Sequence, residues 1–170
     1  MDKGRAVATG QRGFTLMEMM AVIAIMAILA LMSLPSYMDR IVRQQIEAAL
    51  PLADIAKKPI ADWWAASQTF PPDNTAILLP APEKIVNNFI DRIVVQDGAI
   101  HITFGNRANG AIAGKILTLR PAVVPDAPVV PATWVCGMAD APQKMQLQGN
   151  NLTSVPESFL PLDCRALKRS

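Results

Sequence analysis

Residues 13–34 read Gly13-Phe14-Thr15-Leu16-Met17-Glu18 and then MMAVIAIMAILALMSL, an apolar run that only Ser33 interrupts. From Phe14 to Tyr37 the chain has 24 residues, and Glu18 is their single charge. A helix of that length crosses a bilayer core of about 30 Å. Three basic residues and one acidic residue precede the run, so the positive-inside bias keeps residues 1–12 in the cytoplasm. The sequence therefore predicts a transmembrane helix near the N-terminus and an exported remainder.

We expect this span to be retained, because the residues after Leu34 make a poor signal-peptidase site without an Ala-x-Ala pattern. Glu18 then needs an explanation, since a carboxylate inside a span costs on the order of 2.5–3.5 kcal/mol. Glu18 either reaches the headgroups at the cytoplasmic interface or pairs with a cation. Cleavage after Gly13 would supply that cation, the new amino group of Phe14.

The order Gly13-Phe14-Thr15-Leu16-Met17-Glu18 before an apolar helix resembles the class III signal of bacterial type IV prepilins. The resemblance implies that a prepilin peptidase cuts after Gly13 and methylates Phe14. It also implies that Glu18 pairs with the N-terminus of a neighbouring subunit during assembly. Pro35 falls where the family has its helix-kinking proline, whereas Ala27 stands where many major pilins have a glycine.

Two further stretches are similar to type IVa pilins. One is the Trp-Trp pair, polar link and Phe-Pro of residues 63–71, and the other comprises Trp134-Val135-Cys136 with residues 160–165. In an exported bacterial domain, the only two cysteines, Cys136 and Cys164, favour one disulfide over two free thiols. Such a bridge would enclose 27 residues and stabilise the fold by roughly 3–4 kcal/mol in a chain-entropy estimate.

The helical pattern continues beyond the span. Apolar residues recur at roughly helical spacing, namely Ile41, Val42, Ile46, Ala49, Leu50, Ala53, Ile55, Ile60 and Trp64. Pro51 and Pro59 lack the amide donor, so each should kink or break this helix. Because neighbouring helical residues are about 100° apart, only one of Trp63 and Trp64 should lie fully in the core.

Strand patterns follow a proline-rich connector. Residues 93–96 and 99–104 flank Asp97-Gly98, which is a strong hairpin signal, and residues 115–120 and 133–135 supply two more strands. Pro121 and the three prolines at 125, 128 and 131 should form a loop that is excluded from a central strand. We therefore predict an α+β fold: a long N-terminal helix packed on a four-stranded antiparallel sheet, with a disulfide-closed C-terminal region.

This prediction divides the chain into seven segments. They are a leader (1–13), the transmembrane and assembly helix (14–37), its amphipathic continuation (38–66), a connecting loop (67–91), the sheet (92–135), the disulfide-bounded region (136–164) and a tail (165–170). The last two segments carry a possible basic patch of Lys144, Arg165, Lys168 and Arg169, which we interpret as solvated surface rather than a DNA site.

Composition excludes several functions. Without the leader the chain has thirteen basic and thirteen acidic residues, a balance that argues against nucleic acid as the main partner. The sole histidine, His101, cannot build a metal cluster and reads as an ordinary strand residue, and no glycine-rich phosphate loop is present. Asn151-Leu152-Thr153 is a chance sequon in a bacterial protein. We expect no enzyme activity, no metal and no cofactor.

The resemblance implies the structural subunit of a type IV pilus, supporting adhesion, twitching motility or DNA uptake. Its partners would be other pilin subunits, the prepilin peptidase and the inner-membrane assembly machinery. The precursor would lie in the inner membrane and the product in a pilus on the cell surface. The alternatives are a minor pilin, a type II secretion pseudopilin, and an unprocessed bitopic membrane protein with a ligand-binding head.

Overall fold

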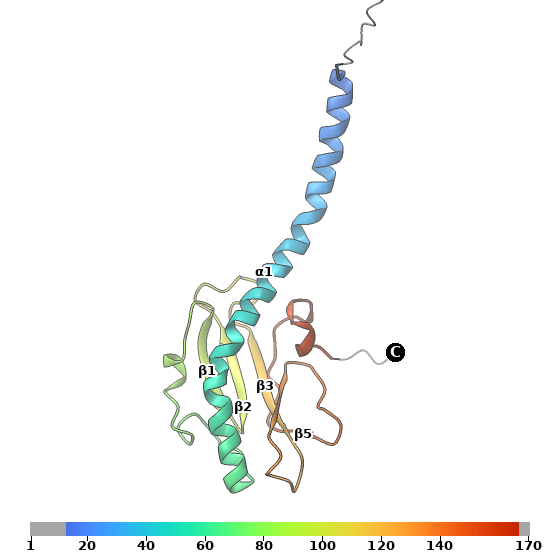
Figure 1. The fold of residues 1–170 in the computed structure, drawn as a ribbon. Coiled ribbons are helices and arrows are strands. Elements are labelled where there is room, and N and C mark those ends of the chain that lie inside the picture. Colours follow the sequence, from blue (N-terminus) through green and yellow to red (C-terminus); the bar gives the residue numbers. More distant parts are fainter. Residues whose placement is uncertain (1–12, 167–170) are drawn as a thin grey trace, which may run out of the picture. The chain divides into compact units, whose positions relative to one another are not determined.

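A computed structural model of the protein describes residues 13–166, apart from the side chains of residues 33–36. Its longest element is helix α1, Leu16–Ser67 (Figure 1). The chain forms two compact units that divide after Tyr37, and α1 contributes to both. Residues 1–12 of the predicted leader and the lysine and arginine at positions 168 and 169 lie outside the described residues.

Within the second unit, α1 presents one apolar face to the sheet. Its buried residues follow a spacing of three or four and are Val42, Ile46, Ala49, Ala53, Ala56 and Ile60. Ile55, which we expected on this face, is exposed instead. The helix continues through Pro51 and Pro59, so the predicted break does not occur. Each proline removes only one amide donor, and the buried alanines and isoleucines on either side hold the helix against the sheet.

The predicted four-stranded antiparallel sheet is confirmed. Its strands lie in the order β1 (Ile90–Gln96), β2 (Ala99–Phe104), β3 (Ile116–Val123) and β4 (Thr133–Cys136). A two-residue strand, β5 (Gln146–Leu147), also pairs with β3 and comes from the disulfide-bounded region. The hairpin turn between β1 and β2 has positive φ at both Asp97 and Gly98, as a type I′ turn requires.

Strand β3 extends further than predicted, because Pro121 lies within it opposite Trp134 of β4. The carbonyl of Pro121 accepts a hydrogen bond from the Gln148 amide, so the proline nitrogen also faces away from β4. On that side β2 has already ended, since its last pair with β3 is Ile100 with Leu119. The missing donor therefore costs β3 no bond to β2, and on this side the strand meets only Gln148 and the two-residue β5, which is why a proline is tolerated here.

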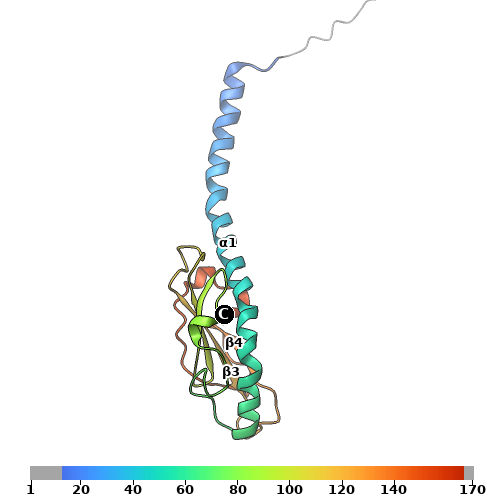
Figure 2. The same cartoon turned by 90° about the vertical axis from the view of Figure 1, so that its left-hand side faces the viewer.

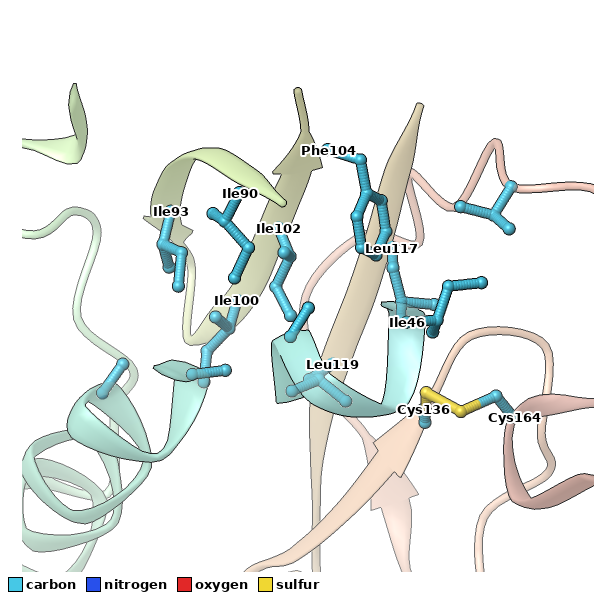
Figure 3. Packing of buried hydrophobic residues seen from close by; sticks show 14 of the residues in the cluster. Ile46, Ile90, Ile93, Ile100, Ile102, Phe104, Leu117, Leu119, Cys136 and Cys164 are labelled. Carbon is cyan, nitrogen blue, oxygen red and sulfur yellow. A yellow bond between two sulfur atoms is a disulfide. The ribbon is translucent and has the colours of Figure 1, made fainter. Parts of the chain in front are cut away.

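The core lies between α1 and one face of the sheet (Figures 1 and 2). In Figure 3, Ile46 of α1 meets Ile102, Phe104, Leu117 and Leu119 from β2 and β3. All five side chains are almost completely buried. Strand β2 is buried along nearly its whole length, so both of its faces are covered.

The connector from residue 68 to residue 89 is irregular, as predicted, with one 3₁₀ turn at Pro82–Lys84. Trp64 stacks on Phe70 with a ring-centroid distance of 4.9 Å, while Trp63 packs against the core. Both tryptophans are only partly buried, so the expectation that one of them lies fully in the core is wrong. Their neighbour Gly98 has no room for a side chain, since a Cβ there would lie 2.4 Å from the Phe70 ring.

The connector also covers the outer edge of β1. The Asn74 side chain accepts a hydrogen bond from the Val95 amide at 2.7 Å and donates one to the Ile93 carbonyl at 3.1 Å. A third bond runs from Asn74 to the Pro80 carbonyl at 3.3 Å, and Asn74 is only 3 % exposed. Asn74 therefore takes the place of a neighbouring strand, and these two backbone groups at the edge of β1 both have hydrogen-bond partners.

Candidate functional site

The start of α1 is a capping box. The Thr15 hydroxyl accepts a hydrogen bond from the Glu18 amide at 3.2 Å, and Glu18 Oε2 accepts one from the Thr15 amide at 3.3 Å. Thr15 is therefore the N-cap and Glu18 the third helical residue, so two amides without helical partners are satisfied reciprocally. Thr15 also donates its hydroxyl proton to Glu18 Oε2 at 3.4 Å.

Glu18 thus has a partner within its own chain, in addition to the headgroups or the cation that the sequence predicted for it. Thr15 was missed as a site residue. The signal was present in the sequence, since a threonine three residues before a glutamate and ahead of an apolar run is the capping-box pattern. The carboxylate also lies in the first turn, where the helix dipole favours negative charge.

The residues around this cap are open to solvent. Phe14 is 81 % exposed, and no atom lies within 4 Å of a Cβ built on Gly13. Together with Thr15 and Glu18 these two residues line a shallow hollow at the start of the helix. The bond between Gly13 and Phe14 is therefore sterically accessible.

The helix that follows is apolar on every side. Its exposed large side chains between residues 16 and 32 are Leu16, Met17, Met19, Met20, Val22, Ile23, Ile25, Met26, Ile28, Leu29, Leu31 and Met32. In the described part of the chain, α1 alone is long and apolar enough to cross a membrane, with a mean hydropathy of 2.3 in its most apolar window. A helix that is hydrophobic all round needs lipid or other helices around it. Pro35 lies within α1, but its side chain is outside the described part.

The predicted disulfide joins Cys136 at the end of β4 to Cys164, with an S–S distance of 2.08 Å (Figure 3). The bridge is not the only attachment of residues 137–163. Main-chain bonds also run from the Met138 amide to the Cys164 carbonyl and from the Ser154 amide to the Ile116 carbonyl. Side chains add to these, since Thr153 Oγ1 accepts from the Thr118 amide at 3.1 Å.

The remaining polar residues that the sequence singled out have structural partners. Asn151 donates to the Gly137 carbonyl at 2.8 Å and accepts from the Thr153 amide, so its amide is occupied within the fold. Arg165 donates to the carbonyls of Leu160 and Ser158. Within residues 13–166, no three His, Cys, Asp or Glu side chains lie close enough together to hold a metal ion.

His101 lies in β2, as predicted, and is 3 % exposed. Its Nδ1 lies 3.0 Å from the Thr118 hydroxyl, while Nε2 has no hydrogen-bond partner among the described residues. Burial lowers the pKa of His101 below its ordinary value, because the charged ring loses its hydration.

This burial predicts a pH dependence of folding. Below a pH of about 6.5 the unfolded chain binds a proton at His101 before the folded chain does, so the free energy of unfolding should fall as the solution becomes acidic. The contribution of neutral His101 to the free energy of unfolding is complete above that pH, and it is lost as the pH falls towards the pKa of His101 in the folded chain. Urea unfolding of the full chain in detergent between pH 8 and pH 5 measures it. His101→Gln should flatten the profile, and an equal slope in both proteins would contradict this role for His101.

Comparison with known proteins adds two family matches. Residues 42–165 match the family model described as pilin (bacterial filament), and residues 9–34 match the prokaryotic N-terminal methylation motif. Over 163 residues the chain is 31% identical to the type IV major pilin protein PilE1 of Neisseria gonorrhoeae, covering 92% of this chain and 88% of that protein. It is 29% identical to a fimbrial protein of Neisseria meningitidis serogroup B, over 92% and 95% of the two chains. Fimbrial protein EcpC of Eikenella corrodens is 36% identical over 65% of this chain and 74% of its own.

Proposed function

The chain belongs to the pilin family of bacterial filament proteins, and from that premise we propose that it enters a type IV pilus after cleavage between Gly13 and Phe14. It is a structural subunit, and its place is a pilus on the cell surface, built with other pilin subunits. A prepilin peptidase would cut and methylate the chain, and an inner-membrane machinery would extract it. The observation that carries this proposal is the exposed start of α1, where an accessible peptide bond, a polar cap and an all-apolar helix follow one another.

The chemistry of the cap fits a role in assembly. Both hydrogen bonds that Glu18 accepts from Thr15 use Oε2, which leaves Oε1 to accept from an ammonium group. Cleavage after Gly13 would create such a group at Phe14, and methylation of this primary amine gives a secondary amine that still carries a positive charge when protonated. The Glu18 carboxylate of one subunit would then bind the Phe14 amine of the next without giving up its own cap.

This pairing would decide how the helices associate. Lipid tails and leucine side chains are similarly apolar, so transfer of α1 from the membrane into a helix bundle gains little from hydrophobicity alone. A buried carboxylate without a partner is strongly destabilising, and one with a partner is tolerated. Pairing of Glu18 with Phe14 would therefore favour one register of neighbouring helices over others.

The test is mass spectrometry of filaments sheared from the native bacterium. We expect an abundant chain that begins at Phe14, heavier by one CH2 unit, since a methyl group replaces a hydrogen, and lighter by two hydrogens for the Cys136–Cys164 bridge. A full-length chain found only in membranes would refute processing and favour a bitopic membrane protein.

A substitution at the cleavage site tests the same proposal directly. Gly13→Ser places a side chain beside the bond that the peptidase must bind, and we expect the uncut precursor to accumulate and filaments to be lost. An immunoblot of whole cells distinguishes precursor from processed chain by size. Gly110→Ser is the matched control, because a Cβ at Gly110 also meets no atom within 4 Å and Gly110 is far from the leader in the sequence. Normal processing of the Gly13 variant would contradict the assignment of the site.

A further inference from the structure

Leu78 occupies an unfavourable position in the connector that follows α1. Its φ is +57°, a left-handed conformation that asparagine and glycine adopt far more readily than leucine. Its side chain is also 94 % exposed, whereas the neighbouring Ile77 is buried and Leu79 packs against the core. Both the backbone conformation and the exposure thus disfavour leucine in the isolated subunit.

The loop that carries Leu78 is firmly built. Asp73 Oδ1 accepts hydrogen bonds from the Ala76 amide at 2.9 Å and from the Thr75 hydroxyl, and the Asn74 carbonyl accepts one from the Leu79 amide at 3.0 Å. Asn74 in turn is bonded to β1, so residues 73–79 lie along the edge of the sheet, beside β1 in Figure 1. Leu78 is therefore held outward by a fixed turn.

A groove on the same unit is suited to receive an apolar side chain such as leucine. Ile41, Gln44 and Gln45 of α1 and Phe89 of the connector line a cavity of about 340 Å³. Its wall is fixed by a hydrogen bond from the Asn109 amide to Gln45 Oε1 at 2.8 Å.

Two arginines lie next to residues that line this groove or precede them in the chain. Arg40 precedes Gln44 by one helical turn, and the Arg107 amide binds the carbonyl of Asn88, next to Phe89. Neither makes an ion pair within residues 13–166. The loop of Leu78 carries the opposite charge at Asp73, whose pKa the Thr75 hydroxyl and the Ala76 amide hold below its ordinary value.

We propose that Leu78 of one subunit inserts into the groove formed by Ile41, Gln44, Gln45 and Phe89 of a second copy, with Asp73 facing these two arginines. This inference rests on the proposed filament. Repeated addition of copies requires two different surfaces on each subunit, because a head-to-tail contact is needed for open growth. Burial of Leu78 in that contact compensates for the conformation and exposure that it has in the free subunit.

Cysteine cross-linking in filaments tests the contact. The double variant Leu78→Cys/Gln44→Cys should give a ladder of covalent multimers on a non-reducing gel after mild oxidation. Each single variant should remain monomeric, as should Val129→Cys/Gln44→Cys, whose residue 129 is 89 % exposed in a different loop. Filaments of the double variant that dissolve entirely into monomers would overturn the contact while leaving the proposed function intact. Absence of processed filaments from the unmodified chain would refute the proposed function itself.

Leu78→Asn provides a second test that does not depend on cross-linking. Asparagine suits the left-handed backbone, so the melting temperature of the full chain in detergent should not fall and is expected to rise by about 2–4 °C. The yield of sheared filaments should nevertheless drop by about tenfold or more, since each subunit loses a buried leucine. Leu152→Asn, at another exposed leucine, is the control and should leave the yield unchanged. An unchanged filament yield for Leu78→Asn would overturn the inference.

Discussion

Glu18→Gln is expected to reduce surface filaments by more than about tenfold while membrane insertion and cleavage stay normal. The glutamine amide oxygen can still accept a hydrogen bond from the Thr15 amide, so the capping box and the start of α1 survive. What the variant loses is the charge that would pair with the Phe14 amine of the next subunit. That amine would then lie unpaired in a dry helix bundle, where an isolated charge is strongly destabilising.

Three companion variants separate the charge from the cap. Glu18→Ala removes both, Thr15→Ala removes the hydroxyl of the cap and keeps the charge, and Thr15→Ser retains both. We expect filament yield to depend mainly on the charge and less on the cap: it should fall by more than about tenfold in both Glu18 variants, fall less in Thr15→Ala and stay normal in Thr15→Ser. Electron microscopy and immunoblots of sheared material measure the yield. Normal filaments in Glu18→Gln would refute the pairing and leave the cap as the only role of this carboxylate.

Asn74→Ala is expected to lower the free energy of unfolding by about 2–5 kcal/mol. The substitution leaves the Val95 amide and the Ile93 carbonyl without the partners that Asn74 gives them, and each buried group without a partner costs about 1–3 kcal/mol. It also frees the loop of residues 73–79 from β1. The variant should therefore expose the edge of the sheet and aggregate more readily than the parent.

Asn74→Asp is the matched control, because it keeps the acceptor for the Val95 amide but cannot donate to the Ile93 carbonyl. Its carboxylate would be buried at a position that is 3 % exposed, so the variant should be destabilised at neutral pH and partly recover in acid. Urea unfolding of the full chain in detergent, followed by tryptophan fluorescence, measures both effects. A loss below about 1 kcal/mol for Asn74→Ala would show that water replaces the side chain at this edge.

Much of the architecture could be predicted from local patterns. The apolar run from Met19 to Leu34 with one carboxylate four residues after Phe14 identified the long apolar helix and the family, and Asp97-Gly98 between two alternating segments located the hairpin. These features depend on near neighbours in the chain, through helix length, turn conformation and side-chain periodicity. The roles of Gly13, Phe14 and Glu18 remain predictions that the experiments above test, and the role of Pro35 also remains a prediction.

Other features were decided only by contacts between distant residues. Pro121 lies in a central strand because β2 has ended where its nitrogen faces, and α1 passes through Pro51 and Pro59 because its buried face is held on the sheet. Asn74 completes the edge of β1 from some twenty residues away, a role that nothing in its local sequence announces. The sequence by itself determined the apolar N-terminal helix, the hairpin and the family, because these depend on local chemistry. Tertiary structure determined which backbone groups need partners and which side chains supply them, because hydrogen-bond satisfaction depends on what the fold brings close in space.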